Sequence, residues 1–490
     1  MSITAKERAE FEAVIGLECH VQLQTTTKAF TSASAAFGGA PNSHVDPYTL
    51  ALPGTLPVLS RAAVECALKI GLATSCTIRR VSRFARKHYF YPDLPKGYQI
   101  SQFDEPLCEG GTVEFPMPCK PGEKPELRSV RLTRIHMEED AGKNTHVVGT
   151  PYSLVDYNRA GVPLVEIVSE PDIRSSAEAV AYLRAIRQIV RYLGISDGNM
   201  DEGSLRADAN VSVRPVGQAE YGTKAELKNM NSFKNIEAAI EYEIVRQIEQ
   251  IKRGERVVQE SRLWNVEKGI SIAMRSKEEA HDYRYFPEPD LPPLSVDDAW
   301  IEDVQRALPE LPVAKRRRYV EVLGLSEYDA AVLTADQAIA TYFEAAHHDG
   351  APPKLVANWL ASELLGRLNK DEKTIEQSPI SASALAGLTK LVDDKTISGK
   401  MAKGVFDTMW ATGKSAKQIV DEEGLVQVTD STAIEAACKA AVDANPKQAD
   451  AYRAGKTTML GFFVGQVMKA TQGKANPELV NEILKSLLGG

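Results

Sequence analysis

Hydrophobic and polar residues alternate along two segments in the first half of the chain. Every second residue of segment 205–214 is apolar, and the residues between them are polar or charged. Segment 17–23 has the same pattern. Because a period of two places successive side chains on opposite faces of an extended chain, both segments are predicted to be half-buried β-strands. A shorter run, 224–228, places its charged side chains on one face in the same way.

Helical periodicity appears between and after these strands. Apolar residues recur every three or four positions after Ser175 and again after Ser232, and the two series end at Gly194 and Gly254. Serine is a preferred N-cap residue and glycine a preferred helix stop. Both series are therefore predicted to be helices that pack on the sheet.

A change in pattern predicts a domain boundary. The first part of the chain is rich in glycine, proline and short alternating runs, whereas the rest has helical periodicity. Between them, segment 286–294 carries four prolines, which neither a helix nor a central strand tolerates. We predict an α+β fold with three parts: a domain 1–294 with a mixed or antiparallel sheet and flanking helices, an all-α domain 295–400, and an all-α tail 401–490.

The bulk composition is that of a globular chain. Of the 490 residues, 43% are hydrophobic and 25% are charged. No run of about 18 apolar residues and no secretory signal occurs, so we expect no membrane span and a cytoplasmic location. The six cysteines form no C-x-x-C pair, so a cysteine zinc site has little support.

The charge balance bears on nucleic-acid binding. A net charge of −8 disfavours a binding surface that covers the whole chain. From Arg453 to the end, five cations face two anions, a local excess of +3. That excess fits a patch for phosphates, and it fits a solvated helix surface equally well.

Several familiar motifs are absent from the sequence. It contains no G-x-x-x-x-G-K-[ST] loop, no G-x-G-x-x-G and no G-x-S-x-G. Acyl transfer through a serine of this chain is therefore not expected.

Acidic and imidazole side chains on the predicted strands suggest a metal site. Glu18 and His20 project from one face of segment 17–23, and segment 136–143 supplies three consecutive carboxylates. Carboxylates with one imidazole suit a hard cation such as Mg²⁺. The alternative is a surface of mutually paired ions, which has no function.

Charged strand faces elsewhere suggest phosphate binding. Arg206 and Asp208 share one face of their strand, as do Lys224 and Glu226. Cations beside carboxylates suit phosphoryl transfer, in which catalysis is mostly positioning and charge neutralisation. Segment 86–102 adds cations and aromatic residues that can stack on bases or pack a loop internally.

A resemblance to a known family gives these features a context. The chain resembles the B subunit of the bacterial aspartyl/glutamyl-tRNA(Asn/Gln) amidotransferases nearly from end to end. The segments that carry the resemblance are 15–23, 89–103, 136–143, 165–172, 202–210, 223–229 and 282–290.

The resemblance implies a carbon–nitrogen ligase that works with Mg²⁺ and ATP. Its N-terminal domain would be a cradle, its helical tail would bind tRNA, and the chain would form a heterotrimer with an amidase subunit and a small clamp-like subunit. The amidase would release ammonia from glutamine. This chain would phosphorylate the misplaced carboxylate of Glu-tRNA(Gln) or Asp-tRNA(Asn), and ammonia would then displace the phosphate.

Specific residues follow from the family motifs. By this resemblance, Glu18, His20 and Glu139 would bind the metal. Lys87 and Tyr89, together with Glu139, would lie where ammonia enters the site.

Two further expectations concern the nucleotide and zinc. From the strand faces alone we assign Arg206, Asp208, Lys224 and Glu226 to contacts with the nucleotide or the tRNA acceptor end. Some family members hold zinc with four cysteines, but the matching positions here carry no thiol, so we expect no zinc. Those positions are Thr31, Ala33, Asp46 and Thr49.

Two other functions remain open from the sequence. One is a metal-dependent hydrolase built on Glu18 and His20. The other is a non-catalytic tRNA-binding module, because the tail alone is typical of an RNA-binding domain. Which mischarged tRNA is the physiological substrate does not follow from this chain.

Overall fold

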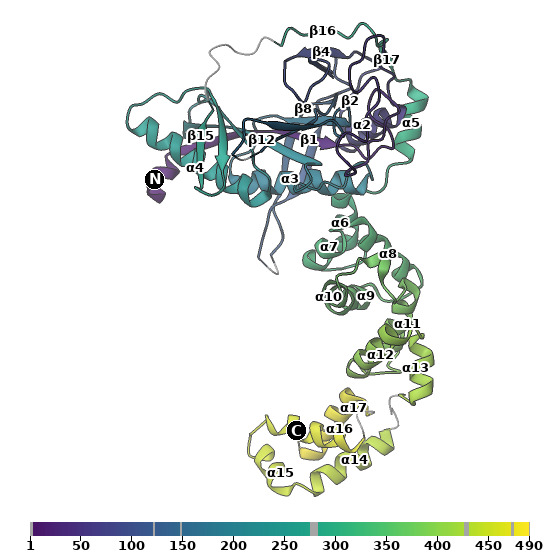
Figure 1. The fold of residues 1–490 in the computed structure, drawn as a ribbon. Coiled ribbons are helices and arrows are strands. Elements are labelled where there is room, and N and C mark those ends of the chain that lie inside the picture. The colour runs from purple at the N-terminus through teal and green to yellow at the C-terminus, as the bar shows by residue number, and fades with distance from the viewer. Residues whose placement is uncertain are drawn as a thin grey trace. The chain divides into compact units, whose positions relative to one another are not determined.

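The computed structural model divides the chain into two compact units, Met1–Lys315 and Arg316–Gly490. Figure 1 shows the first as a sheet with helices and the second as helices. The residues that the structure describes are 3–120, 123–147, 149–274, 283–425, 431–471 and 475–489. Asp282, the first residue of motif segment 282–290, and Lys474, one of the five cations counted from Arg453 onward, lie outside the described residues.

The strands belong to the first unit. Their bounds are β1 Phe11–Gln22, β2 Thr77–Ile78, β3 Val81–Ser82, β4 Ala85–His88, β5 Tyr98–Ser101, β6 Cys108–Glu109, β7 Thr112–Pro116, β8 Leu127–Glu139, β9 Lys143–His146, β10 Ser153–Asp156, β11 Pro163–Ser169, β12 Leu205–Pro215, β13 Ala225–Lys228, β14 Ser261–Asn265, β15 Ile270–Ala273, β16 Phe286–Pro287 and β17 Leu294–Ser295.

The helices occur in both units. In the first unit they are α1 Ala5–Ala9, α2 Arg61–Ala73, α3 Ser176–Tyr192, α4 Phe233–Lys252 and α5 Asp298–Arg306. Helix α6, Pro312–Glu321, spans the division between the units. In the second unit they are α7 Glu327–Leu333, α8 Gln337–His348, α9 Pro353–Trp359, the π-helix η1 Leu360–Leu364, α10 Leu365–Lys370, the 3-10 helix η2 Ile375–Gln377, α11 Ala382–Asp393, α12 Gly399–Thr412, α13 Ala416–Glu423, α14 Ser431–Asp443, α15 Pro446–Arg453, α16 Met459–Ala470 and α17 Pro477–Leu488.

Within the described residues, one 13-stranded sheet organises the first unit. Its path runs β15-β14-β13-β12-β1-β11-β8-β5-β4-β16. The central strands β12, β1, β11 and β8 are antiparallel, and β13 pairs with β14 in parallel, so the sheet is mixed. This confirms the predicted α+β class.

The two faces of the central strands differ as the alternation predicted. Leu17, Cys19 and Val21 of β1 are buried in the core, whereas His20 between them is partly exposed. Helices α3 and α4 pack beside each other against the sheet, as Figure 1 shows beneath β1 and β12. The apolar face of the sheet is thus covered by helices, which leaves the polar face for chemistry.

Both predicted helices form. The Ser175 side chain accepts a hydrogen bond from the Glu178 backbone N–H at the start of α3, and Ser232 caps α4 in the same way. Gly194 and Gly254, just after the two helices, have positive φ of 63° and 77°, a backbone region that favours glycine.

The predicted boundary at residue 294 does not coincide with the division between the units. The proline-rich segment is not a linker, because β16 within it pairs with β4 and β17 pairs with β3. Prolines are tolerated there because β16 lies at the edge of the sheet. Helix α5 then packs on α2, so the first unit continues to Lys315.

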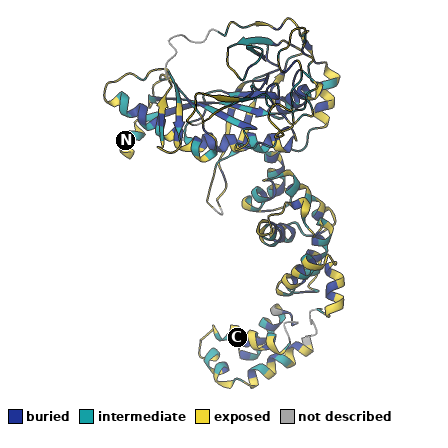
Figure 2. Ribbon diagram, in the orientation of Figure 1, coloured by how far each residue is buried: buried dark blue, intermediate teal, exposed yellow. Residues whose placement is uncertain are grey.

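The second unit has two separate hydrophobic cores in its described residues. One extends from Tyr319 to Val420 and the other from Ile434 to Leu488. Figure 2 shows buried residues along these helices. The predicted boundary at residue 400 falls inside the first core, because α12 and α13 pack on α11. The division into three domains remains a prediction, with these corrections to its boundaries.

Candidate functional site

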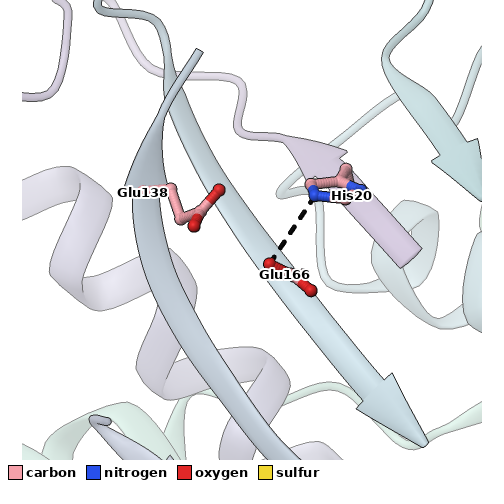
Figure 3. A group of neighbouring side chains, drawn as sticks. All are labelled: His20, Glu138 and Glu166. Carbon is pink, nitrogen blue, oxygen red and sulfur yellow. Dashed lines mark ion pairs between the residues drawn. The ribbon is translucent and has the colours of Figure 1, made fainter. Parts of the chain in front are cut away.

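Two carboxylate side chains and one imidazole converge on the polar face of the sheet. His20 of β1 lies opposite Glu166 of β11, which lies opposite His136 of β8. Glu138 is two residues further along β8 and so projects from the same face. Possible ligand atoms of His20, Glu138 and Glu166 all lie within 4.8 Å of one another. Figure 3 shows these three side chains, which we call the metal-site group.

His136 lies between the two carboxylates of this group and contacts both of them. Its Nε2 lies 3.2 Å from Glu138 Oε1 and 3.2 Å from Glu166 Oε2. His20 Nε2 lies 3.6 Å from Glu166 Oε2. All of these side chains except His20 are buried, so the charges interact in a weakly screened environment.

The pKa values show that the carboxylates stay ionised despite burial. Burial alone would raise the pKa of Glu138, but the hydrogen bond and charge of His136 and the charge of Lys87 hold it well below its usual range. Burial opposes ionisation of Glu166 too, and His136 again lowers its pKa. For His136, burial favours the neutral ring, but hydrogen bonds to Glu138 and Glu166 raise its pKa to about 9.

Glu18 lies near this group without belonging to it. Its carboxylate accepts a hydrogen bond of 2.9 Å from Asn210 Nδ2. Burial, and then the charge of Glu166, raise the pKa of Glu18. The structure thus places Glu18 on the same face as His20, one side-chain position away from the three converging residues.

The structure does not bring Glu139 together with His20, although the family motif led us to expect both in one ligand set. Successive residues of a strand project from opposite faces, so Glu139 points away from Glu138. Its carboxylate lies 2.6 Å from Lys96 Nζ and accepts a 2.9 Å hydrogen bond from the Ile100 backbone N–H. In a run of three acids, only pairing with β11 decides which one faces the site.

Lys87 lies opposite Gln99 in the β4–β5 ladder, and Gln99 Nε2 donates a 3.1 Å hydrogen bond to Glu138 Oε2, which places Lys87 on the Glu138 side of the sheet. Burial is the largest influence and lowers the pKa of Lys87, but the charges of Glu138 and Glu166 and two nearby tyrosines together outweigh it, so the pKa is raised. Burial raises the pKa of Tyr89, and the Glu138 charge adds to the effect. Both side chains therefore share the electrostatic environment of Glu138.

A large cavity opens beside the metal-site group. Its volume is about 910 Å³, and Arg206, which lies opposite His20 in the β1–β12 ladder, lines it. Asp208 also lines it, 2.9 Å from Lys228 Nζ. Further basic side chains in the wall come from Lys143 and Arg159.

The other two residues assigned to the nucleotide lie outside the cavity wall. Glu226 is 2.7 Å from Lys228 Nζ and accepts a 2.5 Å hydrogen bond from Ser261 Oγ. Lys224 is exposed. The structure therefore brings Arg206 and Asp208 to the cavity, but not Lys224 and Glu226.

Sequence reasoning missed Glu166 and His136, and it named Glu139 in place of its neighbour Glu138. Glu166 is the single charge in the otherwise uncharged strand β11. A lone buried carboxylate in such a strand needs a partner or a metal, and that was the available signal. His136 lies two residues before Glu138 on the same strand face, a spacing that was visible in the sequence.

Four positions of one loop match the zinc-binding cysteines of some family members, and hydrogen bonds hold that loop here. Asp46 accepts one from Thr31 Oγ1 and another, of 2.8 Å, from the Thr49 backbone N–H. The fourth position is Ala33. That this chain binds no zinc stays a prediction.

Comparisons with known proteins agree over the whole chain. Residues 13–302 match the GatB/GatE catalytic domain and residues 341–488 match the GatB domain. Three similar proteins are each named as the B subunit of an aspartyl/glutamyl-tRNA(Asn/Gln) amidotransferase. That of Syntrophotalea carbinolica is 55% identical over 98% of this chain and 99% of its own length. That of Carboxydothermus hydrogenoformans is 53% identical over 98% of this chain and 99% of its own length. That of Crocosphaera subtropica is 50% identical over the full length of both chains. Among the described helices, none is long and apolar enough to cross a membrane.

Proposed function

Since this chain belongs to the family of aspartyl/glutamyl-tRNA(Asn/Gln) amidotransferase B subunits, we propose that the metal-site group is the centre of that reaction in this chain. The family catalyses the ATP-dependent amidation of mischarged Glu-tRNA(Gln) and Asp-tRNA(Asn), a ligase reaction. The observation that carries the proposal is the convergence of His20, Glu138 and Glu166 on the polar face of the sheet.

The chemistry requires activation of a carboxylate. Ammonia does not displace oxide from a carboxylate, because oxide is a very poor leaving group. If a carboxylate oxygen first attacks the γ-phosphorus of ATP, an acyl phosphate forms and ADP leaves. The nitrogen lone pair of ammonia then attacks the carbonyl carbon, phosphate leaves, and nitrogen loses a proton to give the amide.

The donor set of the metal-site group fits Mg²⁺. Two ionised carboxylates offer the hard oxygen ligands that Mg²⁺ prefers, and their lowered pKa values keep these oxygens free of protons near neutral pH, while His20 adds one imidazole nitrogen. Bound there, Mg²⁺ would neutralise charge on phosphate oxygens. Glu18, on the same face, remains a further candidate ligand. His136 orients the two carboxylates by its hydrogen bonds to both.

The cavity beside the group has the size of a nucleotide site and carries charges of both signs in its wall, four basic side chains and the carboxylates of Asp156, Asp201, Glu202 and Asp208. Its volume of about 910 Å³ lies in the range of ligand pockets. Arg206, next to His20 across the ladder, and Lys143 are the cations nearest to this role. Arg206 and Arg159 also pair with Asp140, and Lys228 pairs with Asp208, so a phosphate would have to share these cations with carboxylates. We therefore assign the ATP site, or the adjoining acceptor end, to this cavity. Lys224 and Glu226 fit this assignment less well because they lie outside the wall.

The partners and location are proposed on the same basis. An amidase subunit would supply ammonia from glutamine, and a small clamp-like subunit would complete the heterotrimer. Lys87 and Tyr89 would meet the incoming ammonia beside Glu138. The helical tail would hold the tRNA body, and the complex would work in the cytoplasm.

The proposal is tested with the reconstituted complex of this chain, an amidase subunit and a small subunit. Mischarged tRNA is incubated with ATP, Mg²⁺ and glutamine, and amide on the tRNA is measured for each substrate. The wild-type complex should form amide only when ATP is present. His20→Ala should abolish amide formation while the glutaminase activity of the partner persists. Unchanged amidation by His20→Ala would overturn the assignment.

A further inference from the structure

A segment far along the chain from the metal-site group packs against β4 and Lys87. We call residues 283–290 the strap. It runs along β4, the strand that carries Lys87. The His88 backbone N–H donates a 2.9 Å hydrogen bond to the Tyr283 carbonyl, and the Glu288 N–H donates a 2.8 Å bond to the Phe84 carbonyl. Between these bonds, β16 pairs antiparallel with β4.

A buried ion pair fastens the strap to β4. Arg86 Nε and Nη2 donate hydrogen bonds of 2.7 and 2.8 Å to the two oxygens of Glu288, and Nη2 donates a 3.0 Å bond to Asp290. The Glu288 side chain has no exposed surface. The Arg86 guanidinium also lies 4.2 Å from the centre of the Tyr98 ring. A bidentate pair of this kind fixes geometry as well as charge.

The strap places aromatic rings against the side chain of Lys87. Lys87 Nζ lies 5.1 Å from the centre of the Tyr283 ring, a cation–π distance. Tyr283 meets Tyr285 edge to face at 6.0 Å, and Tyr285 stacks on Phe103 at 4.1 Å with an interplanar angle of 6°. Tyr89 meets Tyr283 at 6.3 Å. The rings thus form a continuous aromatic wall beside Lys87.

We propose that the strap is a positioning element of the catalytic centre, in which Arg86 and Glu288 fix the strap and the Tyr283 ring holds the Lys87 ammonium beside the metal-site group. This inference rests on the proposed function of that group. A free lysine side chain has many rotamers, and ordering it before substrate arrives removes an entropic cost from the reaction. The Tyr283 ring supplies that order, because it attracts the ammonium on one side and is itself fixed by Tyr285 and the strap backbone.

The experiment must separate this positioning role from a purely structural one. In a purely structural role the strap covers the edge of the sheet, and its tyrosines contribute to stability alone. The two roles differ in what a conservative change does. A phenylalanine ring retains the cation–π attraction for Lys87, whereas leucine of similar bulk loses it.

The experiment compares Tyr283→Phe, Tyr283→Leu and Glu288→Gln in the full reconstituted complex. The control is Tyr242→Leu, which removes an edge-to-face contact of 5.9 Å with Trp264 in the same unit but away from Lys87. For each complex, kcat and KM for mischarged tRNA and for ATP are measured, together with the melting temperature.

We expect Tyr283→Leu to lower kcat for amide formation about tenfold, with both KM values near those of the wild type. Tyr283→Phe should retain most of kcat, and Glu288→Gln should lower kcat in the same direction as Tyr283→Leu. Tyr242→Leu should lower the melting temperature and leave kcat unchanged.

Three results would overturn the inference. They are wild-type kcat in folded Tyr283→Leu, an equal loss in Tyr283→Phe and Tyr283→Leu, and a change confined to KM. A wild-type complex that forms no amide with ATP would instead refute the proposed function, so the two failures are distinguishable.

Discussion

The two units of this chain differ in what they bury. In the part of the chain that the structure describes, the buried charged side chains all belong to Met1–Lys315. They are Lys28, His136, Glu138, Glu139, Asp140, Glu166, Glu178, Glu243, Arg246, Glu288 and Lys315. The buried polar residues described in Arg316–Gly490 are uncharged: Thr334, Thr389 and Asn476.

This difference indicates where each unit does its work. A buried charge is costly unless it is paired or binds a metal, so a unit that retains many of them has a use for the charges or a network that satisfies them. In the helical unit, Thr334 and Thr389 donate hydrogen bonds to their own helix, to Ala330 and Leu385. Because the described cores of this unit hold no buried charge, we expect its charged contacts with a partner to come from its surface.

We expect the largest effect from a substitution in the metal-site group, which is buried in the first unit. Glu166→Gln keeps the shape of the side chain but removes a charge that His136 and His20 share. We expect amide formation to fall by about a thousandfold or more, as when one essential group of a catalytic set is removed. Glu363→Gln in the helical unit, which affects a partly exposed pair with Lys403, should leave kcat unchanged. Equal effects of the two substitutions would remove the contrast between the units.

The next effect concerns stability. Glu243 accepts hydrogen bonds from Arg246 and Gln247 and lies 3.5 Å from Arg262. Glu243→Ala leaves the buried Arg246 without its carboxylate partner, so we expect a loss of about 3–5 kcal/mol in the free energy of unfolding. Asp407→Ala, which breaks an exposed pair with Arg367, should cost less than about 1 kcal/mol. Urea denaturation of each full-length variant measures the difference, and similar losses would contradict the comparison.

A smaller effect is expected from pH. Burial lowers the pKa of Lys28 to about 8 in the folded chain, against an ordinary value of 10.5. Between these two values the unfolded chain holds a proton that the folded chain has lost, so raising the pH favours the fold. The free energy of unfolding should therefore rise between pH 8 and pH 10.5, by at most about 3 kcal/mol from this group.

Lys28→Met isolates that contribution. Subtracting the pH profile of the variant from that of the wild type cancels all groups that the two proteins share. The difference should increase from pH 8 upward and level off near pH 10.5. A flat difference would show that Lys28 keeps its ordinary pKa in the fold.

The smallest effect tests the surface of the helical unit. The hydrophobic core from Ile434 to Leu488 is separate, so deleting residues 431–490 should leave the other cores intact. We expect KM for mischarged tRNA to rise about tenfold and to depend less on salt, because phosphate contacts release counterions. KM for ATP and glutamine should not change. An unchanged KM for tRNA would show that the tail does not grip it.

Much of the fold could be predicted from the sequence because its signals are local. Strict alternation placed β1 and β12 with the correct faces, and serine caps with terminal glycines placed α3 and α4. The proline-rich segment predicted a domain boundary, but it forms the edge strands β16 and β17, where prolines are tolerated. Pairing at a sheet edge depends on distant residues, which periodicity does not reveal.

The site was only partly predictable for the same reason. Glu18 and His20 follow from the alternation within one strand. Choosing Glu138 over Glu139 requires the register of β8 against β11, where Glu138 lies opposite Leu164. That register is set by contacts between segments far apart in sequence, so a run of three acids leaves the ligand undetermined.

The central claim, that His20, Glu138 and Glu166 hold a divalent cation, is tested most directly by Mn²⁺ binding to matched variants. The free ion is measured by electron paramagnetic resonance in titrations of wild type, Glu138→Gln and Glu139→Gln, with melting temperatures to confirm folding. The account predicts that Glu138→Gln weakens Mn²⁺ binding by at least about tenfold. Glu139→Gln, on the opposite face, should bind Mn²⁺ like the wild type. Loss of binding in Glu139→Gln with normal binding in Glu138→Gln would contradict the account.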